Sequence, residues 1–421
     1  MPESIIEKIK RKEDYLNQLP LTDNELKNLK FLKETFDLQR KSLNSLLPEI
    51  EDSIYHNHNN ILRKLTKTIE IRLFSGLTPR DVFLYRYILL DKPLLPYFNN
   101  LGLTKEKVIN NIKYQVSLTY EEFEIESGEL PSINTRIFDV RYKRLLDVSK
   151  EFLIYKRPEN VKEENLSNFL DEIFKHYNFI PYHNFAHGFN VMQFFHILTK
   201  ESTVISKHFD KETKFWVCLA AICHDAGHLG NNNAYYVNKG HDFSFNNIER
   251  SVLETYHSSN ILKTLSKEGC DLSVIKEQKQ LMIEAILATD MSRHFELFDK
   301  FKALNLNEQL KRDDLIDLTG FLIHTSDIAN PVFYFDNYIS WSKFVTQEFM
   351  QQTLNEKKNN LPVTKMMEYH GDLGFCKAQL GFINFFVLPL FKEIGNKINN
   401  DEWELMCKKN IEVLNGMIKK K

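Results

Sequence analysis

Large apolar residues recur three and four positions apart through most of the chain beyond residue 132. This period places them on one face of an α-helix, whereas the strict alternation of a half-buried strand is scarce. We therefore predict an all-α fold, a compact multi-helix bundle joined by short polar loops. The predicted helices cover residues 166–177, 189–199, 215–223, 248–265, 276–287, 315–324, 337–352 and 376–394.

The first 130 residues differ from the rest in being rich in Lys, Asn, Glu and Leu. Heptad spacing relates six large apolar residues there, namely Leu29, Leu32, Phe36, Leu43, Leu46 and Ile50. Such a seam could join two copies of the chain as a short coiled coil and so form a homodimer. Pro48 interrupts the seam, which favours instead an amphipathic helix that packs on its own chain.

This change in composition predicts two regions. Further helices are expected over residues 79–116, and the acidic stretch 121–129, followed by Pro131, is typical of a linker. We predict a helical N-terminal region over residues 1–130, whose role is unknown, and a second domain over residues 131–421. All the candidate chemistry lies in the second domain.

Charge and hydropathy exclude several classes of protein. The formal charge of -2 gives no overall attraction to nucleic acid or to an anionic membrane. No apolar run approaches the ~20 residues of a membrane-spanning helix, and the first residues, MPESIIEKIKRKED, are too charged for a secretory signal. The five cysteines form no C-x-x-C pair, as expected of buried, reduced thiols. We expect a cytoplasmic protein that binds no nucleic acid and has no transmembrane segment.

Two short strings hold four histidines and a carboxylate within apolar segments. His183 and His187 are four residues apart, as are His224 and His228, so each pair is expected to share a helix face. Asp225 follows His224 directly. Imidazole nitrogens beside a carboxylate suit a zinc-type ion, and further carboxylate oxygens with water suit a harder ion such as magnesium. The two strings therefore indicate a metal-dependent hydrolase.

Three further polar clusters lie within apolar helical segments: Glu254 with His257, Thr289 with Asp290, and His324 with Asp327. A buried carboxylate is costly unless it is paired or bound to metal, so Asp327 needs a partner. A cation would supply one, held by His187, His224, Asp225 and Asp327. Two imidazoles and two carboxylates leave room for water, which indicates a catalytic site rather than a closed structural one. A single histidine of this kind is more often a core residue, but the number and order of the clusters favour a site.

Six motifs follow one another along the chain: Tyr-His-Asn-x-x-His, His-Asp-x-x-His-x-Gly-x-x-Asn, Leu-Glu-x-x-His, Ala-Thr-Asp-Met, His-x-x-Asp-x-x-Asn-Pro and Gln-x-Gly-Phe. This ordered set resembles the class I cyclic-nucleotide phosphodiesterases over about residues 133–415. The short sequence segments around the motifs are most similar to the cGMP-selective type nine branch. The resemblance implies an all-α fold of the HD-domain/phosphodiesterase type. It also implies hydrolysis of a 3',5'-cyclic nucleotide to the nucleoside 5'-monophosphate.

The resemblance also assigns the metal ligands. The first ion, usually zinc, would be held by His187, His224, Asp225 and Asp327. The second ion, usually magnesium or manganese, would share Asp225 and be completed by waters that His228, Glu254 and Thr289 anchor. Two cations that share a carboxylate neutralise the phosphodiester and lower the pKa of a bridging water from 15.7 toward ~7.

The remaining assignments concern proton transfer and the base. His183 would be the general acid for the leaving ribose oxygen, and Glu348 would keep its imidazolium charged and aimed. Gln379 and Phe382, three residues apart on a helix, would address the edge and the face of one purine. The other residues implied to line the substrate pocket are Asn330, Tyr338, Trp341 and Phe349.

Two positions depart from the family pattern. Asn190 stands where many members have Asp, and Gly227 stands where the family pattern His-Asp-x-Asp-His has its second Asp. Neither is a direct metal ligand in that pattern, but loss of such supporting carboxylates can change metal affinity by ~10 to 100-fold. A catalytically silent module that binds cyclic nucleotide is therefore one alternative, and a broader nucleotide phosphohydrolase of the His-Asp class is another. The choice between cGMP and cAMP stays open, with a preference for cGMP on branch resemblance.

Overall fold

The computed structural model describes residues 67, 71, 74–80, 82, 128–242, 244, 250–368 and 371–419. Its contacts divide the chain into two units, Met1–Glu121 and Glu122–Lys421. The heptad seam, nearly all of the other expected N-terminal helices and most of the expected linker lie outside the described residues. All the candidate site residues belong to the second unit, which the following paragraphs describe.

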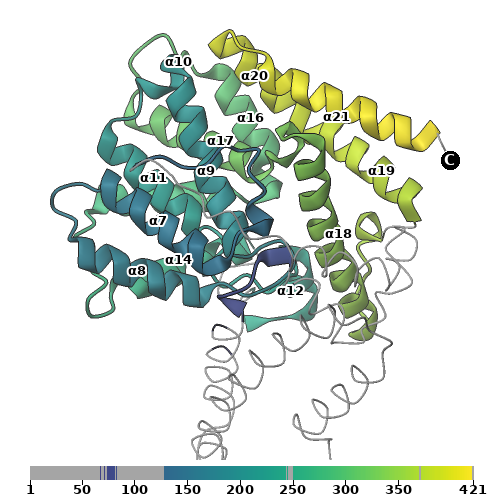
Figure 1. The fold of residues 1–421 in the computed structure, drawn as a ribbon, viewed down its shortest axis with the longest axis horizontal. Helices are drawn as coiled ribbons and strands as arrows, with labels where there is room; N and C mark the ends of the chain where they lie inside the picture. Colours follow the sequence, from purple (N-terminus) through teal and green to yellow (C-terminus); the bar gives the residue numbers. More distant parts are fainter. Residues whose placement is uncertain are drawn as a thin grey trace, which may run out of the picture. The chain divides into compact units, whose positions relative to one another are not determined.

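Helices build the second unit, and its described residues contain no strand, so the prediction of an all-α fold is confirmed (Figure 1). The α-helices are α7 (Tyr142–Lys156), α8 (Glu163–His176), α9 (Phe185–Glu201), α10 (Thr203–Ser206), α11 (Lys211–Cys223), α12 (Asn233–Lys239), α14 (Val252–Leu265), α15 (Lys276–Leu287), α16 (His294–Ala303), α17 (Arg312–Asp327), α18 (Phe335–Lys358), α19 (Gly371–Phe382), α20 (Leu388–Ile398) and α21 (Glu402–Lys419). Short 3₁₀ turns are η1 (Ile137–Asp139), η2 (Met291–Arg293), η3 (Asn330–Val332) and η4 (Lys365–Met367), and η5 (Ile383–Val387) is a π-helix.

Each helix predicted from apolar spacing is present, with ends that differ by a few residues. The helix expected from residue 248 begins only at Val252, because Ser251 has a φ of 39° that no α-helix continues. The predicted helices do not include α7, α10, α12, α16 or α21. In α21 the buried stripe consists of Trp403, Cys407, Asn410 and Leu414, and it is narrow among many charged residues.

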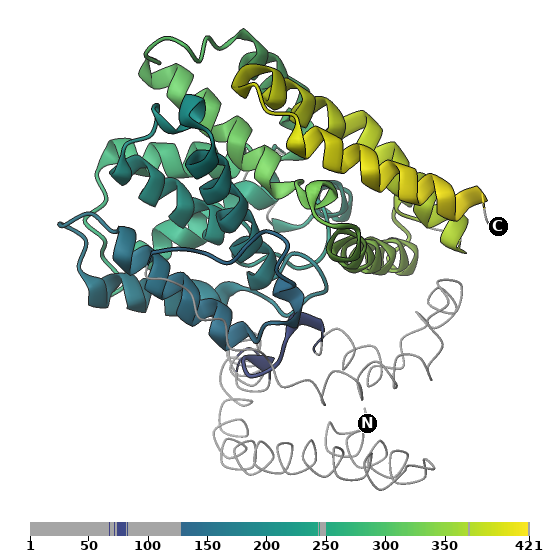
Figure 2. The same ribbon diagram turned by 45° about the horizontal axis from the view of Figure 1, so that its top comes forward.

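Four helices, α9, α11, α15 and α17, pack on one another around the main core, with α9 against α11 and α17, and α15 against α11 and α17. The helices α19, α20 and α21 gather on one side of the unit, and α18 runs beside them (Figures 1 and 2). This arrangement matters for the site, because the metal-ligand candidates end or begin core helices whereas Glu348 and Tyr338 come from α18.

Gly188 permits a close approach between α9 and α11. A Cβ atom at this position would lie 2.7 Å from the Tyr177 hydroxyl and 2.8 Å from the Ile222 carbonyl oxygen. The carbonyl belongs to the α11 backbone and cannot rotate away, so the sequence needs a glycine here despite its low helix propensity.

Replacing Gly188 with alanine is therefore expected to destabilise the fold by about 1–3 kcal/mol, because α9 and α11 must move apart to admit the methyl group. Thermal unfolding of the purified variant measures this effect. Gly416→Ala is the matched control, because a Cβ there meets nothing within 4 Å on another helix. A Gly188→Ala protein that unfolds at the temperature of the parent would show that the two helices are not in contact through this position.

The segment Gly371–Ile398 runs through α19, η5 and α20 as one helix of 28 residues. By length and composition it is the one described helix that could cross a membrane, with a mean hydropathy of 1.4 over its most apolar window. This differs from the prediction that no apolar run is long enough to span a membrane. A single such helix is weak evidence of a span, and α19 and α20 both pack against α21. We assign it to the fold of the second unit.

Candidate active site

The two histidine pairs do not lie on helix faces, contrary to the expectation from their spacing. The side chain of Asn184 accepts hydrogen bonds from the backbone N–H groups of Ala186 and His187, so α9 begins only after His183. At the second pair, α11 ends at Cys223 and residues 224–227 form turns. Gly227, with a φ of 99°, breaks the helical geometry between His224 and His228. Each pair is split between two different parts of the site.

His187, His224 and Asp225 come together, with one candidate ligand atom from each lying within 4.8 Å of the others. Asp327, at the last residue of α17, approaches both imidazoles. Its Oδ1 lies 2.8 Å from Nε2 of His187 and 3.3 Å from Nε2 of His224. The fold thus gathers the four residues predicted to hold the first metal ion, from α9, the end of α11 and the end of α17.

The donor atoms of this cluster fit a divalent cation. His224 donates Nδ1–H to the Ala221 carbonyl at 2.8 Å, which leaves the Nε2 lone pair directed at the carboxylates. Nε2 of His224 and Oδ2 of Asp225 are buried without a hydrogen-bond partner and meet each other only as an ion-pair contact of 3.0 Å. Buried atoms of this kind are costly unless something satisfies them, and a cation would satisfy both.

Electrostatics at the cluster agree with this interpretation. Burial alone would raise the pKa of Asp225, but the neighbouring His224 and His183 hold it well below its ordinary value. Burial likewise opposes a charge on His224, but Asp225 and Asp327 raise its pKa well above the ordinary value. The carboxylates therefore stay ionised and attract positive charge, which a proton or a metal ion can provide.

The two oxygens of Asp225 face different neighbours. Oδ2 faces His224, and Oδ1 lies 3.7 Å from Nε2 of His257. His257 donates its Nδ1–H to the Ala226 carbonyl at 3.1 Å, so its Nε2 lone pair is free to face Asp225. Sequence reasoning noted His257 only as a neighbour of Glu254 and did not place it in the site. Its position three residues after Glu254 was the signal that could have found it.

The residues predicted to anchor waters lie on separate elements around Asp225. Glu254 accepts from the Asn233 side chain at 2.9 Å, and burial, with a smaller effect of Asp290, raises its pKa to about 8. The Thr289 hydroxyl donates to the Ile286 carbonyl at 2.8 Å. His228 accepts at Nδ1 from the Gly230 N–H at 3.0 Å. Their role toward a second ion stays a prediction.

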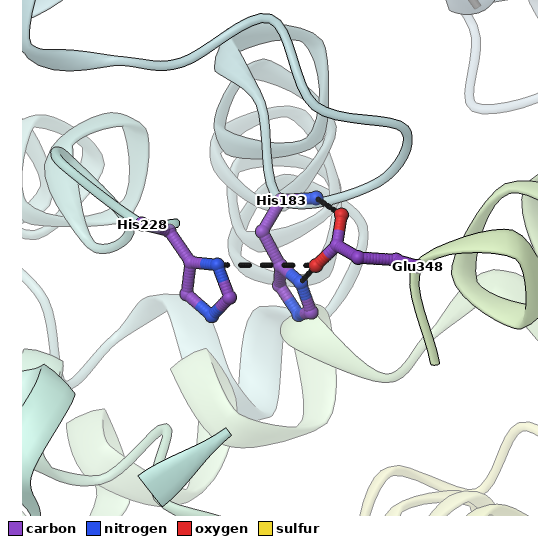
Figure 3. Close-up of side chains that lie close together, drawn as sticks. All are labelled: His183, His228 and Glu348. Atoms are coloured by element: carbon purple, nitrogen blue, oxygen red, sulfur yellow. Dashed lines mark hydrogen bonds and ion pairs between the residues drawn. The ribbon is translucent and has the colours of Figure 1, made fainter. Parts of the chain in front are cut away.

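His183 and Glu348 form a close pair between Nδ1 and Oε1 (Figure 3). The other carboxylate oxygen of Glu348 accepts from the backbone N–H groups of Tyr182, at 2.9 Å, and His183, at 3.2 Å. Burial lowers the pKa of His183, but Glu348, with Asp225 and Asp327, more than offsets this, and the pKa is raised to about 9. Nε2 of His183 is left to deliver a proton, and the side chain is 23% exposed.

His228 packs its ring on His183 at a centroid distance of 4.1 Å and an angle of 26°. His183, His228 and Glu348 also place three candidate ligand atoms within 4.8 Å of one another. However, Glu348 accepts at both oxygens, and His228 accepts at Nδ1 from Gly230. Burial and the nearby His183 lower the pKa of His228 to about 3. Because these atoms already have hydrogen-bond partners, the three residues fit a proton donor, His183, that Glu348 orients, better than they fit a metal site.

The predicted base-binding residues are only partly brought together. Tyr338 donates its hydroxyl to Oε1 of Gln379 at 3.0 Å, and Phe382 contacts Phe386 with a centroid distance of 5.6 Å. Asn330 donates to the Tyr182 hydroxyl at 2.7 Å.

Two of the predicted pocket residues lack such placement. Trp341 is fully buried against Phe138 and Tyr182, behind the metal cluster rather than at an open surface. Phe349 is half-buried beside Glu348, with no ring contact to the other pocket residues among the described part of the chain. The roles of all these residues toward substrate stay predictions.

The two departures from the family pattern are both accommodated. Asn190 is buried and donates to the Gln193 side chain at 3.2 Å, and Gln193 in turn donates to the carbonyls of Pro131 and Ser132. Asn190 thus belongs to a hydrogen-bond network that holds Pro131 and Ser132, at the start of the second domain. Gly227 occupies the left-handed turn after Asp225.

Comparison with known proteins gives one matching family model, 3'5'-cyclic nucleotide phosphodiesterase, over residues 182–407, more than half of the 421 residues. The dual 3',5'-cyclic-AMP and -GMP phosphodiesterase beta of Plasmodium falciparum is 33% identical over 62% of this chain and 24% of its own length. The high affinity cGMP-specific 3',5'-cyclic phosphodiesterase 9A of Drosophila melanogaster is 30% identical over 57% of this chain and 16% of its own length. These matches span a quarter or less of each relative.

Among solved structures, the phosphodiesterase domain of the RhoPDE fusion protein from the choanoflagellate Salpingoeca rosetta is similar with a TM-score of 0.64. The match covers 69% of this chain and 96% of that domain, at 24% sequence identity. This likeness shows the fold alone. It agrees with the all-helical architecture of residues 128–419 described above.

Proposed function

We propose that this chain, which belongs to the 3',5'-cyclic nucleotide phosphodiesterase family, hydrolyses a cyclic nucleotide to the nucleoside 5'-monophosphate. The observation that carries the proposal is the juxtaposition of two groups. One is the buried set of His187, His224, Asp225 and Asp327, and the other is the charged pair of His183 with Glu348. A cation site beside a proton donor is what cleavage of a phosphodiester needs.

The metal ions we propose are zinc and either magnesium or manganese, with the first held by the four-residue set and the second sharing Asp225. Two divalent cations, when bound, neutralise the phosphodiester and acidify a water molecule. The chain itself contributes preorganisation. Hydrogen bonding to Ala221 fixes the His224 tautomer, and the buried carboxylates stay ionised at neutral pH.

His183 performs the proton transfer in this proposal. A ribose alkoxide is a poor leaving group, and a proton delivered from Nε2 of His183 makes it a good one. Glu348 keeps the imidazolium charged by accepting from Nδ1, and two backbone N–H groups hold Glu348 in place. The stacked His228 ring restricts rotation of His183 from the other side. The proton donor is thus positioned before substrate arrives.

The nucleotide we propose is cGMP, with cAMP as a second substrate. The names of both reported relatives include cGMP, and one includes cAMP as well. Gln379 can present either its carbonyl or its NH₂ to a purine edge. The Tyr338 hydroxyl donates to Oε1 of Gln379 at 3.0 Å, a bond that holds the amide with its carbonyl toward Tyr338. A fixed amide favours one purine over the other.

Replacing Tyr338 with phenylalanine is expected to reduce the discrimination between cGMP and cAMP by about 3 to 10-fold, because the amide loses a hydrogen bond worth ~0.5–1.5 kcal/mol and can rotate. The ratio of kcat/KM for the two nucleotides measures this. Tyr334→Phe, at an exposed tyrosine one turn earlier, serves as control. An unchanged ratio in Tyr338→Phe would show that this hydroxyl does not orient Gln379 toward the base.

A steady-state assay of the full chain with cGMP, cAMP and a non-cyclic nucleotide, over a series of magnesium, manganese and zinc concentrations, tests the function. Turnover of a cyclic nucleotide alone supports the proposal. Tight binding of cyclic nucleotide without turnover at any metal concentration would indicate a silent binding module. Comparable turnover of the non-cyclic nucleotide would indicate a broader phosphohydrolase.

We also propose a cytoplasmic location and, as the alternative to an N-terminal helix that packs on its own chain, homodimer formation through residues 1–130, both on sequence grounds alone. Light scattering of the full chain tests the second proposal. A mass of about one chain at micromolar concentration would reject it.

A further inference from the structure

The turn that carries Asp225 is held by side chains that no metal-ligand motif contains. Residues 224–227 connect the end of α11 to the loop before α12, and hydrogen bonds from Ala226 to Cys223 and from His228 to Asp225 close the turn. A turn held only by such local bonds would leave the Asp225 carboxylate free to shift. Two other helices supply further bonds.

Asn260, on α14, bonds the turn on its C-terminal side. Its Nδ2 donates to the Ala226 carbonyl at 2.9 Å, which also accepts from Nδ1 of His257 at 3.1 Å. Asn260 is 4% exposed, and its own backbone carbonyl accepts from the Thr264 hydroxyl at 2.8 Å. A buried neutral amide with a direct bond to the residue after Asp225 is positioned to fix that residue.

The space for this amide exists because position 227 is glycine. A Cβ atom there would lie 2.7 Å from Nδ2 of Asn260 and 2.8 Å from a ring carbon of Tyr256. The φ of 99° is also strained for any other residue. The Asp side chain that the family pattern has at position 227 is thus absent here. The amide of Asn260 lies beside the place where its Cβ atom would be.

Tyr177, at the end of α8, bonds the turn on its N-terminal side. Its hydroxyl donates to the Ile222 carbonyl at 2.8 Å and accepts from the Asp225 N–H at 3.3 Å. Tyr177 is 2% exposed. The helices α8 and α14 pack against each other, so the two side chains reach the turn from one supporting surface (Figure 1).

We propose that Asn260 and Tyr177 are positioning residues of the metal site, which hold the backbone on either side of Asp225 and so fix the direction of its carboxylate. Asn260 thereby supplies, from α14, the polar support that Gly227 cannot supply from within the turn. Neither side chain is among the ligand candidates. The inference rests on the proposed function only in taking Asp225 to bind metal, and not in any assumption about the substrate.

The test measures binding of Mn²⁺ to the metal-free full chain by calorimetry, for Asn260→Ala and Tyr177→Phe. Each variant is expected to bind Mn²⁺ about 10 to 100-fold more weakly, the usual effect of removing a group that orients a metal ligand. Ser259→Ala and Tyr155→Phe are the matched controls. The Ser259 hydroxyl donates to the Thr255 carbonyl within α14 at 2.9 Å, and Tyr155 is 62% exposed. Both controls should bind Mn²⁺ as the parent does.

Thermal unfolding of the metal-free proteins separates positioning from simple destabilisation. The proposal expects Tyr177→Phe to unfold near the temperature of the parent while its affinity for Mn²⁺ falls. The proposal is overturned if both variants bind Mn²⁺ with the affinity of the parent. It is also overturned if the affinity for Mn²⁺ falls only in variants that are unfolded at the assay temperature. If Asn260→Ala does not fold, Tyr177→Phe alone decides.

These results are independent of turnover. A parent chain that binds Mn²⁺ but hydrolyses no nucleotide would reject the proposed function and leave this inference measurable. A parent chain that hydrolyses cyclic nucleotide, with variants that bind Mn²⁺ normally, would reject this inference alone. A parent chain that binds no Mn²⁺ would reject both.

Discussion

Replacing Asp327 with asparagine is expected to lower kcat for the cyclic nucleotide by at least ~10³-fold, which corresponds to ~4 kcal/mol of lost transition-state stabilisation. Asp327 approaches the imidazoles of both His187 and His224, so it is the residue that joins α17 to the rest of the cluster. An amide keeps the shape of the carboxylate but carries no charge, so the cluster loses one of its two anionic ligands for a divalent cation. Metal content and kcat, measured together on purified protein, test this expectation.

Asp317→Asn is the control for this experiment. Asp317 lies ten residues earlier on the same helix, pairs with Lys300 at 2.8 Å and is partly exposed. Surface ion pairs of this kind contribute little to stability, so kcat and metal content should stay within about 2-fold of the parent. If Asp327→Asn keeps its activity with metal still bound, Asp327 is not a required metal ligand, and its assignment to the site is rejected.

Replacing Glu348 with glutamine is expected to move the high-pH limb of kcat/KM toward lower pH. His183 donates its proton only when charged, and its pKa of about 9 depends on the Glu348 carboxylate, since burial acts in the opposite direction. Without that carboxylate the largest opposition to burial is lost, and the pKa of His183 falls. At pH 8 a smaller fraction of His183 is then charged, so kcat/KM at that pH falls by about 10-fold or more, within the ~10² to 10⁴-fold that a general acid contributes. A pH profile from 6 to about 9.5 measures the shift.

The same pair contributes to stability with a definite sign. Because folding raises the pKa of His183, this stabilisation is complete below about pH 6.5 and is lost as the pH rises through about 9. Thermal unfolding of the parent and of Glu348→Gln should therefore converge at high pH.

Glu356→Gln is the matched control for the pH profile. Glu356 lies two turns further along the same face of α18, is equally buried, and bonds Thr364 and Gln352 rather than a histidine. Its loss should affect stability without moving the high-pH limb. If the limb stays in place in Glu348→Gln as well, His183 is not the group that titrates there.

Apolar spacing and motif order were enough to predict helical segments and the residues that the fold gathers. The segments 166–177 and 276–287 coincide closely with α8 and α15, because their apolar residues fall on one wide face and charged residues fill the other. His187, His224, Asp225 and Asp327 could be named because polar groups in otherwise apolar helices need a reason to be buried.

Tertiary structure decided how these residues are used. Spacing placed His183 with His187 and His224 with His228 on shared helix faces, but a cap at Asn184 and a left-handed glycine at position 227 split both pairs. These breaks direct His183 and His228 to Glu348, and His187 and His224 to Asp327. No periodic pattern encodes such breaks, because they depend on single residues at helix ends.

The sequence by itself determined the fold class, the family and the set of polar residues in the core, because these follow from local period, composition and motif order. Only the tertiary structure decided which nitrogen of each histidine faces a carboxylate, which way the Gln379 amide points, and that Asn260 and Tyr177 support the Asp225 turn. The physical reason is that the bonds of Asn260 and Tyr177 reach backbone atoms 34 and 48 residues away, and the Tyr338–Gln379 bond joins side chains 41 residues apart. Partners at such separations meet only when the helices that carry them pack.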